Sequence, residues 1–175
     1  MITATKLPVV TLAAVKYCAF ASEETSCYEA NVLVDGKKIG HVSNEGRGGG
    51  DNFWPHNIEV QLTEIAKAMP RFYPDLENSA ELLMGQLLNR HLQTKDLKRA
   101  LSKRLLFTKA DGKIYQTKPM TKEELAAKLA TGLDALKARF EGAVEVLNVL
   151  PIDKALELYE AGTKPEAKTP ASAQA

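Results

Sequence analysis

The stretch Ser43–His56 reads SNEGRGGGDNFWPH and separates two different periodicities in the 175-residue chain. Before it, apolar residues alternate with polar ones, which is the pattern of half-buried β-strands. After it, apolar residues recur at helical spacing, which is the pattern of amphipathic helices. The boundary between a sheet and a helical region is therefore expected inside this glycine-rich segment.

The segment itself has the composition of an anion-binding loop. Gly46 and the run Gly48–Gly50 permit positive φ and let backbone N–H groups approach a ligand closely. Arg47 adds a positive charge beside consecutive amides that can form an anion-binding nest. The spacing matches neither the P-loop nor the dinucleotide-binding glycine pattern. A connecting loop without a ligand is the competing interpretation.

We predict that this loop and its neighbours contact a ligand or a partner, because polar and aromatic side chains flank the glycines on both sides. The predicted ligand- or partner-binding residues are Ser43, Asn44, Arg47, Gly48, Gly49, Gly50, Trp54 and His56. Trp54, the single tryptophan, either stacks on a base or fills the core. The core position is the interpretation that we favour for it.

The residues before the segment predict a three-stranded antiparallel meander. The first strand covers Val9–Phe20, with a bend near Ala13–Ala14, and the second covers Cys27–Val34. Asp35–Gly36 is a hairpin signal, because this pair accepts the positive φ values of a tight turn. The third strand, Lys37–Ser43, then leads into the glycine-rich loop.

The residues after the segment predict helices and a second β-hairpin. A helix is expected from Ile58 to Pro70, followed by a helix that Asn78 and Glu81 open in a capping box and by a short helix capped by Thr94. A hairpin that turns at 110–112 comes next. A helix from Thr121 to Gly142, a strand at 144–149 and a closing helix after Pro151 complete the order. The residues of the Thr121–Gly142 helix expected to face inward are Leu125, Leu129, Leu133, Leu136 and Phe140. The predicted fold class is therefore α+β, with the meander first and the helical region and its hairpin after it.

Composition fits a single globular domain at residues 1–162. With 45% apolar and 26% charged residues, the chain can bury a core. Residues 163–175 are small, polar and proline-containing, which predicts a disordered or weakly held tail. No apolar run approaches the length of a membrane span, and the N-terminus lacks the regions of a signal peptide. We therefore expect a cytoplasmic protein.

Charge is distributed unevenly, although the formal net charge is only +1. Residues 90–122 hold ten Lys or Arg against two Asp or Glu. A local excess of this size attracts the phosphates of nucleic acid or an acidic protein surface. An ordinary solvated helix face is the competing interpretation. The residues predicted to bind nucleic acid or an acidic partner are Lys95, Lys98, Arg99, Lys103 and Arg104.

No catalytic or metal-binding signature is present in the sequence. His41, His56 and His91 do not have metal-ligand spacing, and Cys18 and Cys27 match no zinc pattern. If the first two strands pair as a simple hairpin, the two cysteines face one another. In a reducing cytoplasm we interpret them as free thiols, with a redox pair as the alternative. We expect no catalytic residue, no metal and no cofactor; the sequence favours a protein that is not an enzyme and leaves enzymatic activity as an open alternative.

Three segments carry a resemblance to a known group of proteins. They are FASEETSCY at Phe20–Tyr28, VSNEGRGG at Val42–Gly49, and KDLKRALSKRLLFTKADGKIYQTK at Lys95–Lys118. The chain resembles, over much of its length, small uncharacterised proteins that bacteriophages and other bacterial mobile elements encode. That group has no assigned activity, cofactor or catalytic residue. The resemblance implies a role in host takeover or counter-defence.

Three functional predictions follow from these observations. The first is a non-catalytic phage or mobile-element accessory protein that binds a bacterial host protein or complex through the glycine-rich loop and the basic segment. The second is sequence-independent nucleic-acid binding through the basic segment, residues 90–122. The third is a nucleotide-binding protein or an enzyme that uses residues 46–50.

Overall fold

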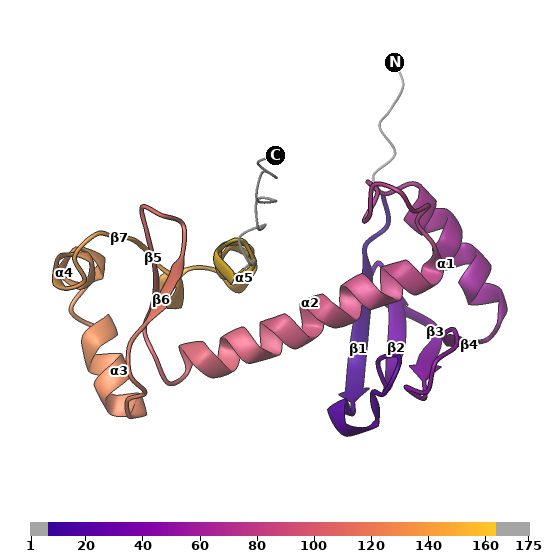
Figure 1. Cartoon of the computed structure of the whole chain (residues 1–175), viewed down its shortest axis with the longest axis horizontal. Coiled ribbons are helices and arrows are strands. Elements are labelled where there is room, and N and C mark those ends of the chain that lie inside the picture. The colour runs from indigo at the N-terminus through magenta and orange to yellow at the C-terminus, as the bar shows by residue number, and fades with distance from the viewer. Residues whose placement is uncertain (1–6, 164–175) are drawn as a thin grey trace, which may run out of the picture. The chain divides into compact units, whose positions relative to one another are not determined.

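The computed structural model describes residues 7–163, which divide into two compact units at the boundary between His91 and Leu92 (Figure 1). Each unit buries its own set of apolar residues. The predicted α+β fold class is confirmed, because a four-stranded antiparallel sheet comes first and helices with a second small sheet follow. The single domain at residues 1–162 stays a prediction. Apart from Thr163, the predicted tail lies outside the described residues.

The first unit is built on an antiparallel sheet with the strand order β1–β2–β3–β4. The strands are β1 (Val10–Tyr17), β2 (Tyr28–Val34), β3 (Lys37–Asn44) and β4 (Asn52–Trp54). The predicted meander is therefore present, and β4 extends it along the free edge of β3. The sequence did not reveal β4, because three residues are too few to show an alternating pattern.

The two local backbone features expected in the meander are both present. Ala14 has a φ of 50°, and the pairing of β1 with β2 shifts between Ala13 and Lys16. β1 therefore carries a bulge at the predicted bend. Asp35 and Gly36 have φ values of 48° and 79°, as the tight turn between β2 and β3 requires.

One face of this sheet is covered by helices and holds the core of the first unit. In β2 the buried side chains alternate, as the sequence predicted, at Tyr28, Ala30 and Val32. Two helices pack on this face: α1 (Asn57–Lys67) and the first half of α2 (Ala80–Leu101), which crosses the sheet in Figure 1. Their buried residues are Ile58, Leu62, Ala66, Ala80, Leu83, Met84 and Leu88.

The start of α2 differs from the predicted capping box. Ser79 caps the helix, since its hydroxyl accepts a hydrogen bond from the Leu82 N–H at 3.3 Å. The predicted cap, Asn78, is buried and donates to carbonyl groups at the end of α1, including that of Ala66 at 2.9 Å. The last carbonyls of a helix lack partners within the helix, so a buried amide there satisfies groups that would otherwise be orphaned.

The prediction of a separate short helix capped by Thr94 is also wrong, because α2 continues without interruption from Ala80 to Leu101. Its second half belongs to the second unit, where Leu97 is fully buried. Threonine has only a weak preference against the interior of a helix. The buried residues before and after Thr94, such as Leu88 and Leu97, keep the chain helical there and override its preference for a cap position.

The second unit contains a three-stranded antiparallel sheet with the order β6–β5–β7. After α2 its elements are β5 (Leu106–Lys109), β6 (Ile114–Gln116), α3 (Lys122–Leu129), α4 (Leu133–Arg139), β7 (Ala143–Val146) and α5 (Ile152–Thr163). The predicted hairpin at 110–112 is confirmed between β5 and β6. The predicted capping box is confirmed as well, since Thr121 and Glu124 exchange hydrogen bonds at the start of α3.

The single helix predicted from Thr121 to Gly142 is wrong. Gly132 has a φ of 88° and separates α3 from α4. Leu133 is consequently 38% exposed, although Leu125 and Leu136 remain buried. The strand predicted at 144–149 ends at Val146 and continues as a 3-10 turn.

The two adjacent aromatic residues of β4 have opposite environments. Phe53 is 2% exposed and lies opposite Val42 of β3, whereas Trp54 is 68% exposed. Successive side chains of a strand point to opposite faces, so the strand can bury only one of them. The prediction that Trp54 fills the core is therefore wrong, and Phe53 takes that place.

We expect Phe53→Ala to destabilise the protein by about 3–4 kcal/mol, because it leaves a cavity in the core. Trp54→Ala should cost less than about 0.5 kcal/mol, as for an exposed side chain. Urea unfolding followed by circular dichroism measures both values without relying on tryptophan fluorescence. Equal losses for the two variants would contradict the assignment.

Candidate functional site

The glycine-rich segment folds against the loop that joins β1 to β2. The carbonyl oxygen of Gly46 accepts the backbone N–H groups of Glu23, Glu24 and Thr25 at 2.9, 3.0 and 3.3 Å. Gly46 has a φ of 84°, and a Cβ there would collide with the Ala21 carbonyl oxygen. Both the backbone conformation and the lack of space therefore require glycine at this position.

The side chain of Asn44, which is 8% exposed, connects the same two loops. Its Oδ1 accepts the Thr25 hydroxyl at 2.8 Å and the Gly46 N–H at 2.9 Å. Its Nδ2 donates to the Gly49 carbonyl at 3.4 Å and to Asp51 Oδ1 at 3.1 Å. These four contacts use the hydrogen-bonding capacity of the amide, so Asn44 positions the site and is not free to bind a ligand.

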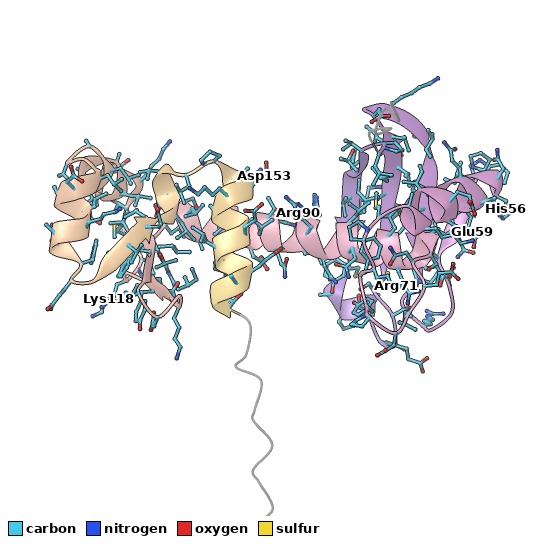
Figure 2. All side chains as sticks on the ribbon, turned by 90° about the horizontal axis from the view of Figure 1, so that it is seen from above. His56, Glu59, Arg71, Arg90, Lys118 and Asp153 are labelled. Carbon is cyan, nitrogen blue, oxygen red and sulfur yellow. The ribbon has the colours of Figure 1, made fainter. Side chains whose placement is uncertain are left out.

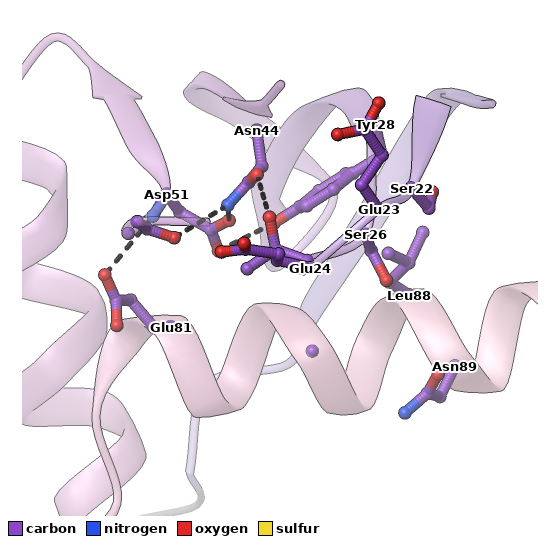
Figure 3. Close-up of a pocket in the computed structure, with 14 residues that line it drawn as sticks. Ser22, Glu23, Glu24, Ser26, Tyr28, Asn44, Asp51, Glu81, Leu88 and Asn89 are labelled. Carbon is purple, nitrogen blue, oxygen red and sulfur yellow. Dashed lines mark hydrogen bonds between the residues drawn. The ribbon is translucent and has the colours of Figure 1, made fainter. Parts of the chain in front are cut away.

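Asp51 lies between the sheet and α2 and contacts both (Figure 3). Its Oδ2 accepts the Tyr28 hydroxyl at 2.7 Å, and its backbone N–H donates to the Glu81 carboxylate at 3.2 Å. Burial raises the pKa of Asp51, hydrogen bonds from Tyr28 and Asn44 oppose this, and the nearby charge of Glu81 adds to it. Burial and the negative charge of Asp51 raise the pKa of Tyr28, which keeps its hydroxyl protonated.

These groups line an open pocket of about 520 Å³ within the first unit (Figure 3). The β1–β2 loop, the residues around Asp51 and one face of α2 form its walls. Four carboxylates line it, those of Glu23, Glu24, Asp51 and Glu81, and none of the described residues around it is Lys, Arg or His. The potential in this carboxylate pocket is therefore negative, which favours a cationic group.

The glycines that were predicted to bind an anion lie beside these carboxylates. A Cβ on Gly48 would meet the carboxylate of Glu24, and a Cβ on Gly50 would meet that of Glu81. The Arg47 side chain is exposed and does not line the pocket. A phosphate bound to these amides would face like charge. Nucleotide binding through this loop stays a prediction, and this charge arrangement disfavours it.

The structure brings only part of the predicted binding set together. Asn44, Gly49 and Gly50 line the carboxylate pocket. Ser43 lines a second hollow of about 420 Å³ on the first unit, which shares Tyr28 and Asn44 with the carboxylate pocket. A role for these residues in binding stays a prediction.

Trp54 and His56 lie together, away from both hollows. Their rings are 5.9 Å apart in an edge-to-face arrangement, and both side chains are exposed. Figure 2 shows His56 at the start of α1 on the outside of the first unit. Neither residue lines the carboxylate pocket, so a ligand there would not stack on Trp54.

Sequence reasoning missed the residues that give the pocket its charge. Glu81 was assigned to a capping box, and no predicted site included Glu23, Glu24 or Asp51. The only available signal was the acidic excess of residues 1–89, which hold eleven Asp or Glu against seven Lys or Arg. That excess gives no position for a site, because the four carboxylates come from three separate segments.

The predicted basic residues lie in and after the second half of α2. Lys95, Lys98 and Arg99 are exposed on the helix, and Lys103 is exposed just beyond it. Arg104 is half-buried and donates to Gln116 Oε1 at 2.7 Å. Within residues 7–163, no acidic side chain forms an ion pair with the exposed four.

Among the described residues, no group of three or more His, Cys, Asp or Glu side chains is placed to hold a metal ion. No helix in that part of the chain has the length and apolar character needed to cross a membrane. Comparisons with protein-family models, with curated proteins and with solved structures find no match to this chain.

We expect Gly46→Ala to destabilise the protein by about 3 kcal/mol or more, because it combines backbone strain with a collision against the β1–β2 loop. Gly49→Ala is the matched control, since Gly49 has a φ of 94° and nothing within 4 Å of an added Cβ. It should cost only the strain of about 1–2 kcal/mol. Chemical unfolding of both variants measures the difference, and equal costs would show that the close approach at Gly46 is unimportant.

Proposed function

We propose that this chain is a non-catalytic binding protein whose carboxylate pocket receives a basic side chain of a bacterial host protein in the host cytoplasm. The observation that carries the proposal is the pocket of about 520 Å³ lined by four carboxylates and no described basic residue. The resemblance to proteins of bacteriophages and mobile elements supports the host context. Interference with a host complex is the role that this context favours.

The pocket has both the size and the charge that a long basic side chain needs. Pockets of roughly 300–1,000 Å³ hold small ligands and anchoring side chains. Carboxylate oxygens of Glu24, Asp51 and Glu81 can accept charge-assisted hydrogen bonds from a guanidinium or ammonium group.

The proposal is tested by titrating the protein with an arginine-rich peptide by calorimetry. We expect Glu24→Gln with Glu81→Gln to weaken binding by about tenfold, because two exposed charge pairs contribute about 0.7 kcal/mol each. The amide that Glu81→Gln introduces can still accept the Asp51 N–H, so the variant keeps the pocket wall. The matched control is Glu59→Gln with Glu77→Gln, which removes the same charge from exposed positions outside the pocket.

To find the host partner, wild type and the same variants are immobilised on a resin and exposed to bacterial lysate. A protein that wild type and the control capture equally, and that the pocket variant loses, is the expected result. Failure of the pocket variant to differ from the control in both assays would overturn the proposed site.

Binding of the basic peptide should also depend on pH. Burial raises the pKa of Asp51, so as the pH falls this carboxyl takes up a proton before carboxyls with ordinary pKa values do. Affinity is therefore expected to fall first at the pH where Asp51 loses its charge. In Asp51→Asn that early loss should disappear, while affinity at neutral pH is already reduced. Identical pH profiles for the two proteins would exclude Asp51 from the interaction.

Nucleic-acid binding by the second unit is a second candidate function. It is favoured by the exposure of Lys98, Arg99 and Lys103 without an acidic partner among the described residues. Phosphate contacts release counterions, so the affinity for DNA should fall steeply with salt. Lys98→Ala with Arg99→Ala should make the slope of log affinity against log salt shallower by about two, because two phosphate contacts are lost.

The control for that experiment is Lys37→Ala with Lys38→Ala, which removes two exposed charges from the β2–β3 hairpin of the first unit. The control should keep the wild-type slope. Absence of a salt-dependent shift of DNA or RNA by the wild-type protein would remove this candidate.

A further inference from the structure

Cys18 and Cys27 lie directly opposite one another where β1 and β2 open into their connecting loop. The strand register pairs Lys16 with Glu29 and Tyr17 with Tyr28, so the next pair is Cys18 with Cys27. The Cys18 N–H donates to the Cys27 carbonyl at 2.9 Å, and the Cys27 N–H donates to Ser22 Oγ at 2.8 Å. Residues directly opposite one another across antiparallel strands have Cα atoms about 4.5–5.5 Å apart. That separation lies inside the range of about 4.4–6.8 Å that a disulfide spans.

The two side chains also share one side of the sheet. Residues directly opposite across an antiparallel pair point to the same face. Tyr28 is buried on the helix-covered face, so its neighbour Cys27 and the opposing Cys18 belong to the uncovered face. Both cysteines line the hollow of about 420 Å³ that also contains Ser43. Both are free thiols, Cys18 exposed and Cys27 half-buried.

We propose that Cys18 and Cys27 form a reversible intrachain disulfide by exchange with a low-molecular-weight disulfide such as oxidised glutathione. The thiolate of the exposed Cys18 attacks one sulfur of the reagent, breaks its S–S bond and releases one molecule of thiol. The thiolate of Cys27 then attacks the Cys18 sulfur of the mixed disulfide and releases the second thiol. The two protein thiols are oxidised, the reagent is reduced to two thiols, and these carry away the two protons.

The bond closes a short loop that forms the rim of the carboxylate pocket. Residues 22–26 of this loop line the pocket, and the N–H groups of residues 23–25 are bound to the Gly46 carbonyl. Cys27 packs against the same glycine, since a Cβ on Gly46 would lie 2.8 Å from Cys27 Cβ. A covalent link across the base of the loop restricts its motion. Any effect on partner binding rests on the proposed function, whereas formation of the bond does not.

The test uses the reduced full-length chain in mixtures of reduced and oxidised glutathione. After alkylation of the remaining thiols, the protein is digested with trypsin and with a protease that cleaves after glutamate. Glu23 and Glu24 lie between the cysteines, so the two cysteine peptides stay joined only through a disulfide. We expect loss of both alkylatable thiols, a monomer lighter by the mass of two hydrogen atoms, and joined peptides that separate on reduction.

Hydrogen exchange of the same samples tests the consequence for the rim. Amide exchange in residues 19–26 should slow in the oxidised protein and return to the reduced rate after treatment with dithiothreitol. Cys18→Ser and Cys27→Ser are the controls, and each should stop at a mixed disulfide with one glutathione. Wild-type protein that keeps two glutathiones, or that links into dimers, would overturn the disulfide. An intrachain disulfide with unchanged exchange in residues 19–26 would overturn its effect on the rim.

Discussion

The buried amide of Asn44 is the contact on which the arrangement of the first unit's loops depends. It joins the β1–β2 loop at Thr25, the glycine-rich segment at Gly46 and Gly49, and the entry to β4 at Asp51. Without the amide, the Thr25 hydroxyl, the Gly46 N–H and the Gly49 carbonyl would lose this partner. A buried polar group without a partner costs more than a hydrogen bond contributes, which makes the fully bonded arrangement strongly preferred. The glycine-rich segment is therefore an ordered wall of the pocket.

Two other asparagines act in the same way at helix ends. Asn78 bonds the Phe72 N–H through its Oδ1 and donates to carbonyls at the end of α1. Asn148 accepts the Leu106 N–H at 2.9 Å and donates to the Leu101 and Arg104 carbonyls at 3.0 and 2.8 Å, where α2 ends. In each case one amide satisfies both donor and acceptor groups that a helix terminus or strand start leaves open. An asparagine amide both donates and accepts hydrogen bonds, and in this chain such amides connect elements that are distant in sequence.

The charge of the pocket depends on which side chains the folded loops bring together. Glu24 lies beside Gly48, Glu81 lies beside Gly50, and Asp51 is held between Tyr28 and Asn44. The same glycines in a loop without those neighbours would present free amides to an anion. With three carboxylates around them, the local field favours a cation, although Arg47 is part of the same loop. The identity of the loop residues therefore says less about the ligand than the identity of their neighbours in space.

The sequence by itself determined the features that depend on residues close together in the chain. The Asp35–Gly36 turn, the bend at Ala13–Ala14 and the Thr121–Glu124 capping box were predicted correctly, because backbone preference and a side chain three positions away are sufficient to produce them. Only the tertiary structure decided the unbroken course of α2 through Thr94, the burial of Phe53 in place of Trp54, and the pocket itself. These depend on which faces of distant elements pack together. Strand register and helix packing place Glu23, Asp51 and Glu81 around one space, and no local pattern of residues encodes that coincidence.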